Sequence, residues 1–280
     1  MKLRYCIIIF LFIIIIISLT KYNYVEKYEN NNILFISPEE TFQKIVDSNY
    51  FNKFTKKDME IRKCKDINNC KEIYKKNIIN FTDKQKSILI NLISKVDNIL
   101  KEYKALYNIP WKFSLVNNNI ENGFPHTHLD IIILSTIFFN KPSNMQLSTL
   151  IHEKIHIYQK LNKSKTEKFY NSYNFKKKYK NTSELRRTNP DLDDFVWEYN
   201  NISFYSEYKK DSNNLGDIEI KLQNLNNNNN LDKNFSIDDF KDNPNIYEHP
   251  DELFAYFLTD KIVNDNFDKN DKKLINYITN

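Results

Sequence analysis

The chain has 280 residues, enough for one large domain or two lobes and for a sizeable buried core. Its 41 basic and 36 acidic residues are mixed along the sequence, and the formal net charge is +5. Binding to nucleic acid needs basic side chains gathered on one face, so this composition predicts no nucleic-acid partner. With only two glycines, the chain also carries no glycine-rich phosphate loop or dinucleotide-binding fingerprint. The sequence predicts no particular oligomeric state.

Residues 1–25 are predicted to be a signal anchor or a signal peptide. Lys2 and Arg4 precede an unbroken apolar run over residues 5–17, which is the pattern of charge and hydropathy that such segments have. A retained anchor would contact the membrane through residues 5–20, and basic residues before the run favour a cytosolic N-terminus. We therefore expect a single-pass membrane protein whose folded body is lumenal or extracellular, or a secreted protein if the segment is cleaved.

Residues 26–80 are predicted to form an N-terminal helical region. Within it, Ser37 is a suitable helix cap and Pro38 suits the first helical position. Cys64 and Cys70 enclose a short loop that a disulfide could close in an oxidising compartment. Two free thiols are the alternative. A zinc site at these cysteines is disfavoured, because no second cysteine pair or nearby histidine completes four ligands.

Residues 81–280 are predicted to form one α+β domain. Apolar residues that recur every three or four positions predict a long helix from Thr82 to about Asn108. Shorter apolar runs, separated by turn residues, predict strands. The other expected elements are strands over residues 111–116, 128–134, 196–208 and 217–222, helices from about 144 to 160 and from about 250 to 262, and an Asn-rich loop over 209–234.

His152, Glu153 and His156 form a His-Glu-x-x-His motif on one predicted helix. The two histidines are four residues apart, so both imidazoles project from one helical face and can converge on one zinc ion. Glu153 lies too far round the helix to be a ligand, but it can reach a water at the metal and act as a general base. Lys154 points away from the histidines, and we expect it at a solvated edge. The alternative is an ordinary helix with two surface histidines.

A catalytic zinc site needs a third protein ligand and an open position for water. No further histidine follows shortly after the motif, but Glu252 lies in the first turn of the last predicted helix. The motif helix and the segment Ile-Tyr-Glu-His-Pro-Asp-Glu-Leu-Phe-Ala-Tyr-Phe over residues 246–257 together resemble zinc metallopeptidases of the zincin type, and among these the gluzincins. The resemblance implies that Glu252 is the third metal ligand. Glu248, His249 and Asp251 are the competing candidates, and an ordinary capped helix is the alternative.

The same resemblance implies a zincin-like fold, with an N-terminal hydrophobic helix, a backing helix, a small β-sheet, an active-site helix and a C-terminal ligand helix. It implies a Zn²⁺-dependent endopeptidase that hydrolyses a peptide or protein substrate with a zinc-activated water and Glu153 as the general base. One alternative is a non-catalytic, membrane-anchored zincin-like binding domain. Another is a membrane-tethered structural protein in which the motif is accidental.

Five further residues are candidates for contact with the substrate or the oxyanion. His126 and His128 enter a strand that in zincins borders the cleft and binds the extended substrate by strand addition. One of them is therefore expected to contact the substrate or to stabilise the oxyanion, and polar residues at a strand end are the alternative. His249 and Tyr247 are also expected to stabilise the oxyanion, with Tyr256 as a further candidate.

Overall fold

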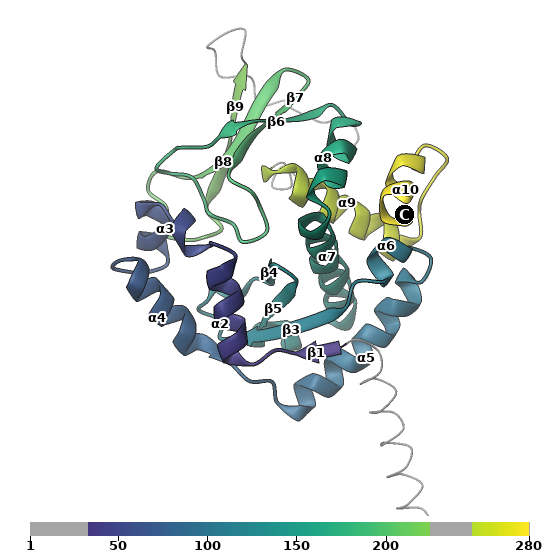
Figure 1. Ribbon diagram of the computed structural model, residues 1–280, viewed down its shortest axis with the longest axis horizontal. Coiled ribbons are helices and arrows are strands. Elements are labelled where there is room, and N and C mark those ends of the chain that lie inside the picture. Colours follow the sequence, from purple (N-terminus) through teal and green to yellow (C-terminus); the bar gives the residue numbers. More distant parts are fainter. Residues whose placement is uncertain (1–32, 225–247, 280) are drawn as a thin grey trace, which may run out of the picture.

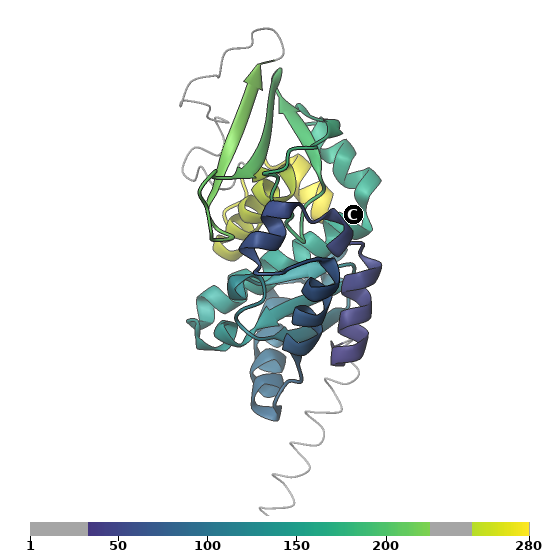
Figure 2. The same ribbon diagram turned by 90° about the vertical axis from the view of Figure 1, so that its left-hand side faces the viewer.

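The computed structural model describes residues 33–224 and 248–279 (Figure 1). These residues form an α+β structure with one five-stranded and one four-stranded sheet, which lie at opposite ends of the view in Figure 2. The helices are α2 (Pro38–Asp47), α3 (Lys56–Ile61), α4 (Ile67–Asn77), α5 (Asp83–Leu100), α6 (Lys104–Tyr107), α7 (Ser143–Leu161), α8 (Lys163–Asn171), α9 (Pro250–Asn264) and α10 (Lys272–Thr279), with 3-10 turns η1 (Phe51–Lys53), η2 (Glu121–Gly123) and η3 (Thr136–Asn140). The strands are β1 (Ile33–Phe35), β2 (Ile78–Ile79), β3 (Trp111–Val116), β4 (His126–His128), β5 (Ile131–Ser135), β6 (Phe175–Lys180), β7 (Phe195–Tyr199), β8 (Ile202–Tyr208) and β9 (Ile218–Asn224).

The five-stranded sheet has the order β1-β3-β5-β4, and β2 pairs with β3. Strands β1, β3 and β5 are parallel, whereas β4 runs antiparallel to β5 at the edge. Along β5, Ile132 and Leu134 belong to the buried cluster of α5 and α7, while Ile131 and Ile133 belong to that of α2 and α4. Helices therefore cover both faces of the sheet, which explains why this strand is a continuous apolar run.

Helix α5 corresponds to the long helix that the sequence predicted from Thr82. Its N-terminus is a capping box, in which the Thr82 side chain accepts the N–H of Gln85 and the Gln85 side chain accepts the N–H of Thr82. The helix ends at Leu100 rather than near Asn108, and the apolar pattern beyond that point belongs to the separate short helix α6. Periodicity alone did not reveal this break, because α6 continues to bury apolar residues in the same core.

The described part of the N-terminal helical region, residues 33–80, packs into the same unit as the rest of the chain. Ser37 caps α2 by accepting the N–H of Glu40, as the sequence predicted. Strand β1 pairs with β3 of the five-stranded sheet. A disulfide joins Cys64, which follows α3, to Cys70 in α4. This segment therefore contributes both a strand and covering helices to the sheet that positions the candidate site.

The four-stranded sheet is antiparallel, in the order β6-β7-β8-β9. The single strand predicted over residues 196–208 is two strands, because Asn200 and Asn201 have φ values of 50° and 66° and form a two-residue hairpin turn. Strand β9 corresponds to the strand predicted over 217–222, and it lies within the predicted Asn-rich loop 209–234. The remainder of that loop, after β9, lies outside the described residues.

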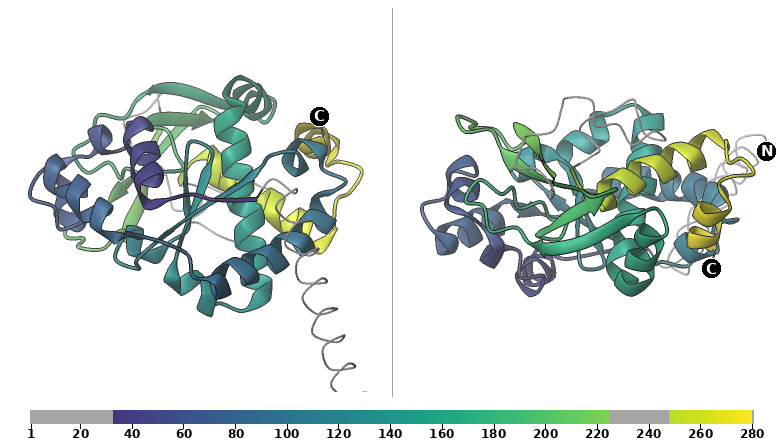
Figure 3. Two further views of the ribbon diagram at one scale, coloured as in Figure 1. Left: turned by 60° about the horizontal axis from the view of Figure 1, so that its bottom comes forward. Right: turned by 90° about the horizontal axis from the view of Figure 1, so that it is seen from above.

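Helix α9 begins at Pro250, as predicted, and packs against α7. Figure 3 shows α7 running through the interior of the molecule with α9 beside it. Phe254 of α9 is buried against Phe169 and Tyr170 of α8. This aromatic packing fixes the first turn of α9 against the middle of α7, where the His-Glu-x-x-His motif lies.

The prediction of a single-pass membrane protein is corrected by the structure. Within residues 33–224 and 248–279, no helix has the length and apolar character needed to cross a bilayer. The longest described helices, α5 with 18 and α7 with 19 residues, both carry several charged residues, which a membrane-spanning helix rarely has. The lumenal or extracellular location inferred from a membrane span is withdrawn with it. Residues 5–20, which carried the prediction, lie outside the described residues.

Candidate metal centre

Three side chains from two helices converge at the motif. The Nε2 atoms of His152 and His156 are 3.0 Å apart, and Glu252 Oε2 lies 3.4 Å from the first and 3.6 Å from the second. Among residues 33–224 and 248–279, these are the three potential ligands whose donor atoms gather within 4.8 Å of one another. Tetrahedral zinc, with bonds of about 2.0–2.1 Å, holds neighbouring ligand atoms about 3.3 Å apart. The donor set therefore fits zinc in both chemistry and spacing.

Contacts behind the ligands orient two of them. The Nδ1 atom of His156 lies 2.8 Å from Gln159 Oε1, an acceptor, so Nδ1 carries the hydrogen and the Nε2 lone pair faces the cluster. The other end of the Gln159 amide donates to the backbone carbonyl of Asp251 at 2.9 Å. On Glu252, the second carboxylate oxygen accepts a hydrogen bond from Asn189 at 3.3 Å. Gln159 thus links α7 to the first turn of α9.

The local charges favour a cation between these ligands. Burial would raise the pKa of Glu252, but the neighbouring His156 and His152 rings hold it well below its usual value. Burial would lower the pKa of His156, but the carboxylates of Asp191 and Glu252 outweigh it and raise that pKa to about 10. The same negative field that favours a proton on His156 favours a divalent metal ion at the cluster.

Glu153 stands beside the ligands without being one of them. Its side chain is buried, and its Oε2 atom has no hydrogen-bond partner among the described residues. Burial, and to a lesser extent the nearby Asp191 charge, raise the pKa of Glu153 well above its usual value. A carboxylate in such surroundings is a stronger base than one in water, as a general base requires.

The metal cluster opens into a cavity of about 610 Å³, here called the metal cleft, whose lining includes His152, Glu153 and Glu252. Three large apolar residues at its rim are each about half exposed: Phe124 at 53%, Met145 at 51% and Tyr256 at 50%. The Tyr256 ring lies 4.5 Å from the His152 ring, centre to centre. Tyr256, one of the residues considered for the oxyanion, lines this cleft.

His249 has a different place from the one the sequence suggested. It caps α9, with its Nδ1 atom accepting the N–H of Asp251 at 3.0 Å. Its Nε2 atom is in contact with Trp197 Nε1 at 2.7 Å and Asp193 Oδ1 at 3.0 Å. Both ring nitrogens are therefore engaged away from the metal cleft, which His249 does not line. Tyr247, the other residue expected to stabilise the oxyanion, lies outside the described residues.

The two histidines of β4 face different cavities. His126 lines the metal cleft, with Nδ1 bonded to the Phe124 carbonyl at 2.9 Å and a buried Nε2 that has no partner among the described residues. His128 bonds to the Ser48 hydroxyl at 2.9 Å and lines a second cavity. The structure therefore brings His126, and not His128, to the metal cleft.

The free edge of β4 is covered where a substrate strand was expected to bind. Thr127 donates its backbone N–H to Asp191 at 2.8 Å, and its carbonyl accepts a hydrogen bond from Lys160 at 2.7 Å. Strand addition at Thr127 therefore has no free backbone groups to use. Sequence reasoning identified the Asn189-Pro190-Asp191 segment only as a turn, and nothing in its pattern indicates that it crosses over β4.

Lys154 does not lie at a solvated edge. It is 1% exposed, its ammonium donates to the Ile109 carbonyl at 2.8 Å, and it lies 3.5 Å from the centre of the Trp111 ring. The residues opposite the histidines on α7 face α5 and β3 rather than water, because α7 is packed on that side as well. A carbonyl acceptor and an aromatic face together make this buried position tolerable for an ammonium group.

The two acidic residues that competed with Glu252 as third metal ligand, Glu248 and Asp251, are engaged elsewhere. Glu248 accepts two hydrogen bonds from Arg187, at 3.1 and 2.9 Å. The Asp251 carboxylate accepts the Tyr170 hydroxyl at 2.6 Å. Glu252 is thus the acidic residue of this segment that reaches both histidines.

Comparison of the chain with known protein families, curated proteins and solved structures finds no match in any of the three.

Proposed function

We propose that this protein is a zinc-dependent endopeptidase of the zincin type, with a gluzincin-like ligand set. The observation that carries the proposal is the convergence of two imidazoles of α7 and one carboxylate of α9, with donor atoms within 4.8 Å. A buried, unpartnered Glu153 oxygen lies in the same cleft. Three protein ligands, of which His152 and Glu252 line an open cleft, are the arrangement that catalytic zinc sites have.

In the proposed reaction, the residues that act on the substrate all line the metal cleft. Glu153 takes a proton from the attacking water and delivers it to the leaving amine. Zinc, when bound, would polarise the scissile carbonyl and make the water more acidic. Tyr256, which packs on His152, donates its hydroxyl to the developing oxyanion. His126 offers its Nε2 atom to an N–H of the substrate backbone.

The second candidate function is a non-catalytic zincin-like binding domain. The covered edge of β4 favours it, because Asp191 and Lys160 occupy the backbone groups of Thr127. A binding domain would retain zinc as a structural ion and would not need the general base.

The two candidates are separated by Glu153→Gln in the full chain, with zinc content and peptide cleavage measured together. We expect the wild type to cleave members of a mixed peptide library, detected by mass spectrometry. Glu153→Gln should lower the rate about 100-fold or more while zinc stays bound. Glu167→Gln, at an exposed position on α8, is the matched control and should leave the rate unchanged. Zinc binding without cleavage in the wild type would instead support the binding domain, and equal rates in wild type and Glu153→Gln would refute the assigned base.

A further inference from the structure

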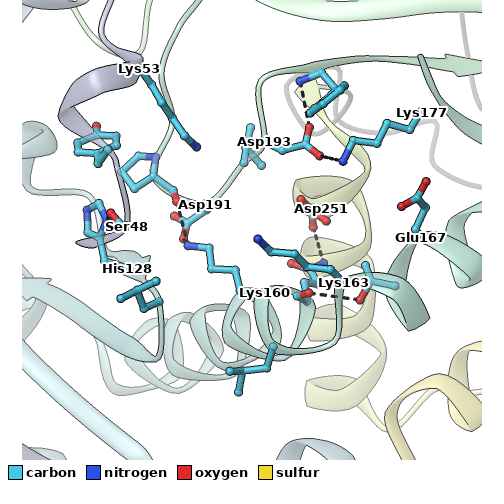
Figure 4. A pocket seen from close by; sticks show the side chains of 18 of the residues that line it. Ser48, Lys53, His128, Lys160, Lys163, Glu167, Lys177, Asp191, Asp193 and Asp251 are labelled. Carbon is cyan, nitrogen blue, oxygen red and sulfur yellow. Dashed lines mark hydrogen bonds and ion pairs between the residues drawn. The ribbon is translucent and has the colours of Figure 1, made fainter. Parts of the chain in front are cut away.

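A second cavity, of about 600 Å³, lies beside the metal cleft, and Figure 4 shows side chains that line it. Pro190 and Asp191 line both cavities, whereas His152 and Glu252 line only the metal cleft and His156 lines neither. The second cavity is bordered by the β4–β5 turn, the end of α7, α8 and the strands β6 and β7. We call it the basic cavity, because four lysines line it: Lys53, Lys160, Lys163 and Lys177.

Most charged groups of the basic cavity are already matched. Lys160 pairs with Asp191 at 3.0 Å, and Lys177 pairs with Asp193 at 2.6 Å. The Asp251 carboxylate accepts a tyrosine hydroxyl at 2.6 Å. Asp130, also in the lining, pairs with Lys44 at 2.8 Å and with Lys112 at 2.5 Å. Each of these four carboxylates therefore already has a partner.

Lys53 is the exception. Its side chain is largely buried and reaches into the basic cavity (Figure 4), and within residues 33–224 and 248–279 its ammonium has no hydrogen bond or ion pair. Burial lowers the pKa of Lys53, and the charge of Lys160 lowers it further against the opposing effect of Asp194. An ammonium group that is partly withdrawn from water without gaining an acceptor is costly. An anion in the cavity would remove that cost.

A second ammonium group reaches into the same space. Lys163, at the start of α8, extends into the basic cavity from the opposite wall to Lys53 (Figure 4), and within the described ranges it too has no ion pair. Glu167, one turn further along α8, is exposed at the rim. His128 adds a buried Nε2 atom without a partner in its wall. Among the described residues, the charged groups of this lining without an ion pair or hydrogen bond are thus two ammonium groups, those of Lys53 and Lys163, and one carboxylate, that of Glu167.

The walls beside the lysines are apolar. Tyr50, Phe195 and Trp197 present ring surface to the basic cavity, and Leu192 contributes a branched side chain. Sites for small molecules combine such apolar walls with a few polar groups that fix orientation. The lining therefore suits a ligand with an apolar body and an anionic group.

We propose that the basic cavity binds a small organic anion, in which an aromatic or other apolar body carries a carboxylate or phosphate group. The anionic group lies between the ammonium groups of Lys53 and Lys163, and the body packs on the ring surfaces of Tyr50 and Trp197. Binding there requires neither zinc nor peptide hydrolysis, since the metal ligands do not line this cavity.

The test is calorimetric titration of the full chain, in EDTA, with 1-naphthyl phosphate, 1-naphthoate and the neutral 1-naphthol. We expect the two anions to bind and 1-naphthol to bind about tenfold more weakly or not at all. Lys53→Met should weaken binding of the anions about tenfold or more, because a charge-assisted hydrogen bond is lost. Lys56→Met removes a nearby exposed charge outside the cavity and should change nothing. The tighter of the two anions identifies phosphate or carboxylate as the preferred group.

Three results would overturn the proposal: no binding of either anion, equal binding to wild type and Lys53→Met, or binding of 1-naphthol as tight as that of the anions. Lys163→Met is the second variant, because its lysine is exposed and its removal leaves the fold intact. It should also weaken anion binding, and unchanged binding in this variant counts against the assigned position of the ligand. Since EDTA removes zinc, the outcome does not depend on the proposed peptidase.

Discussion

Removing the charge of Lys154 tests how the motif helix is packed. This lysine is buried on the side of α7 that faces away from the metal cluster, with the Ile109 carbonyl and the Trp111 ring as its contacts. Burial lowers its pKa from 10.5 to about 7, against the opposing charge of Asp97. The substitution Lys154→Met keeps the length of the side chain and removes its charge.

The pKa of Lys154 gives the size of the expected effect. The difference between 10.5 and about 7 corresponds to about 5 kcal/mol of unfolding free energy. The Trp111 ring stabilises the ammonium by about 2 kcal/mol. The buried ammonium therefore lowers the free energy of unfolding by about 3 kcal/mol. Below pH 7 the lysine is protonated in both the folded and the unfolded chain, so the full cost is present. Between pH 7 and 10.5 the unfolded chain binds more protons, so the stability of the wild type rises with pH.

The assay is urea unfolding in EDTA, followed by circular dichroism, at several pH values from about 6.5 to about 10. Near pH 6.5 we expect Lys154→Met to be more stable than the wild type by about 2 kcal/mol, after subtracting about 1 kcal/mol for the carbonyl that loses its donor. The difference should shrink and then reverse as the pH rises. Lys95→Met, at an exposed position on α5, is the control and should show no such change. A difference that does not vary with pH would refute the reasoning.

Substitutions at three further residues test other contacts of the candidate site and of the structure that supports it. Gln159→Leu removes the partner of His156 Nδ1 and should weaken zinc binding about 10- to 100-fold in competition with a chromophoric chelator; an unchanged affinity would contradict the orienting role. Glu121→Gln removes the carboxylate that faces Arg62 at 3.0 Å. Burial would raise the pKa of Glu121, but Arg62 lowers it to about 2. The substitution should therefore lower the free energy of unfolding, measured in urea near pH 7, by about 3 kcal/mol. This difference between wild type and variant should fade as the pH drops from about 4.5 toward 2. A difference that persists at pH 2 would argue against the ion pair. His249→Ala should lower stability by about 1–2 kcal/mol, and His249→Asn should restore most of it. If His249→Ala instead lost peptidase kcat while keeping full stability, His249 would have a catalytic role.

The local parts of the site could be predicted from the sequence. The spacing of His152 and His156 placed both rings on one face of α7, and Ser37 and Thr82 marked the starts of α2 and α5. Glu252 needed more than spacing, because its approach to the histidines depends on how α9 packs against α7. Only the resemblance to gluzincins identified it among its acidic neighbours.

The parts of the site that sequence reasoning misplaced depend on contacts between distant segments. Lys154 is buried because Trp111, on a strand, lies over the far side of α7. His249 lies away from the metal cleft because its Nε2 atom contacts Trp197 of β7 and Asp193 of the loop before that strand. The edge of β4 is covered by Asp191, which follows β4 by 64 positions. No periodicity within one element carries information about such partners.

The central claim is that His152, His156 and Glu252 hold one zinc ion, and metal analysis tests it most directly. The full chain and three variants would be equilibrated with zinc, freed of excess metal and analysed by plasma mass spectrometry. The variants are His156→Ala, Glu252→Ala and Glu153→Gln. We predict about one zinc per chain in the wild type and in Glu153→Gln, and almost none in the two ligand variants. A wild type without zinc, or Glu252→Ala that retains its full content, would contradict the account.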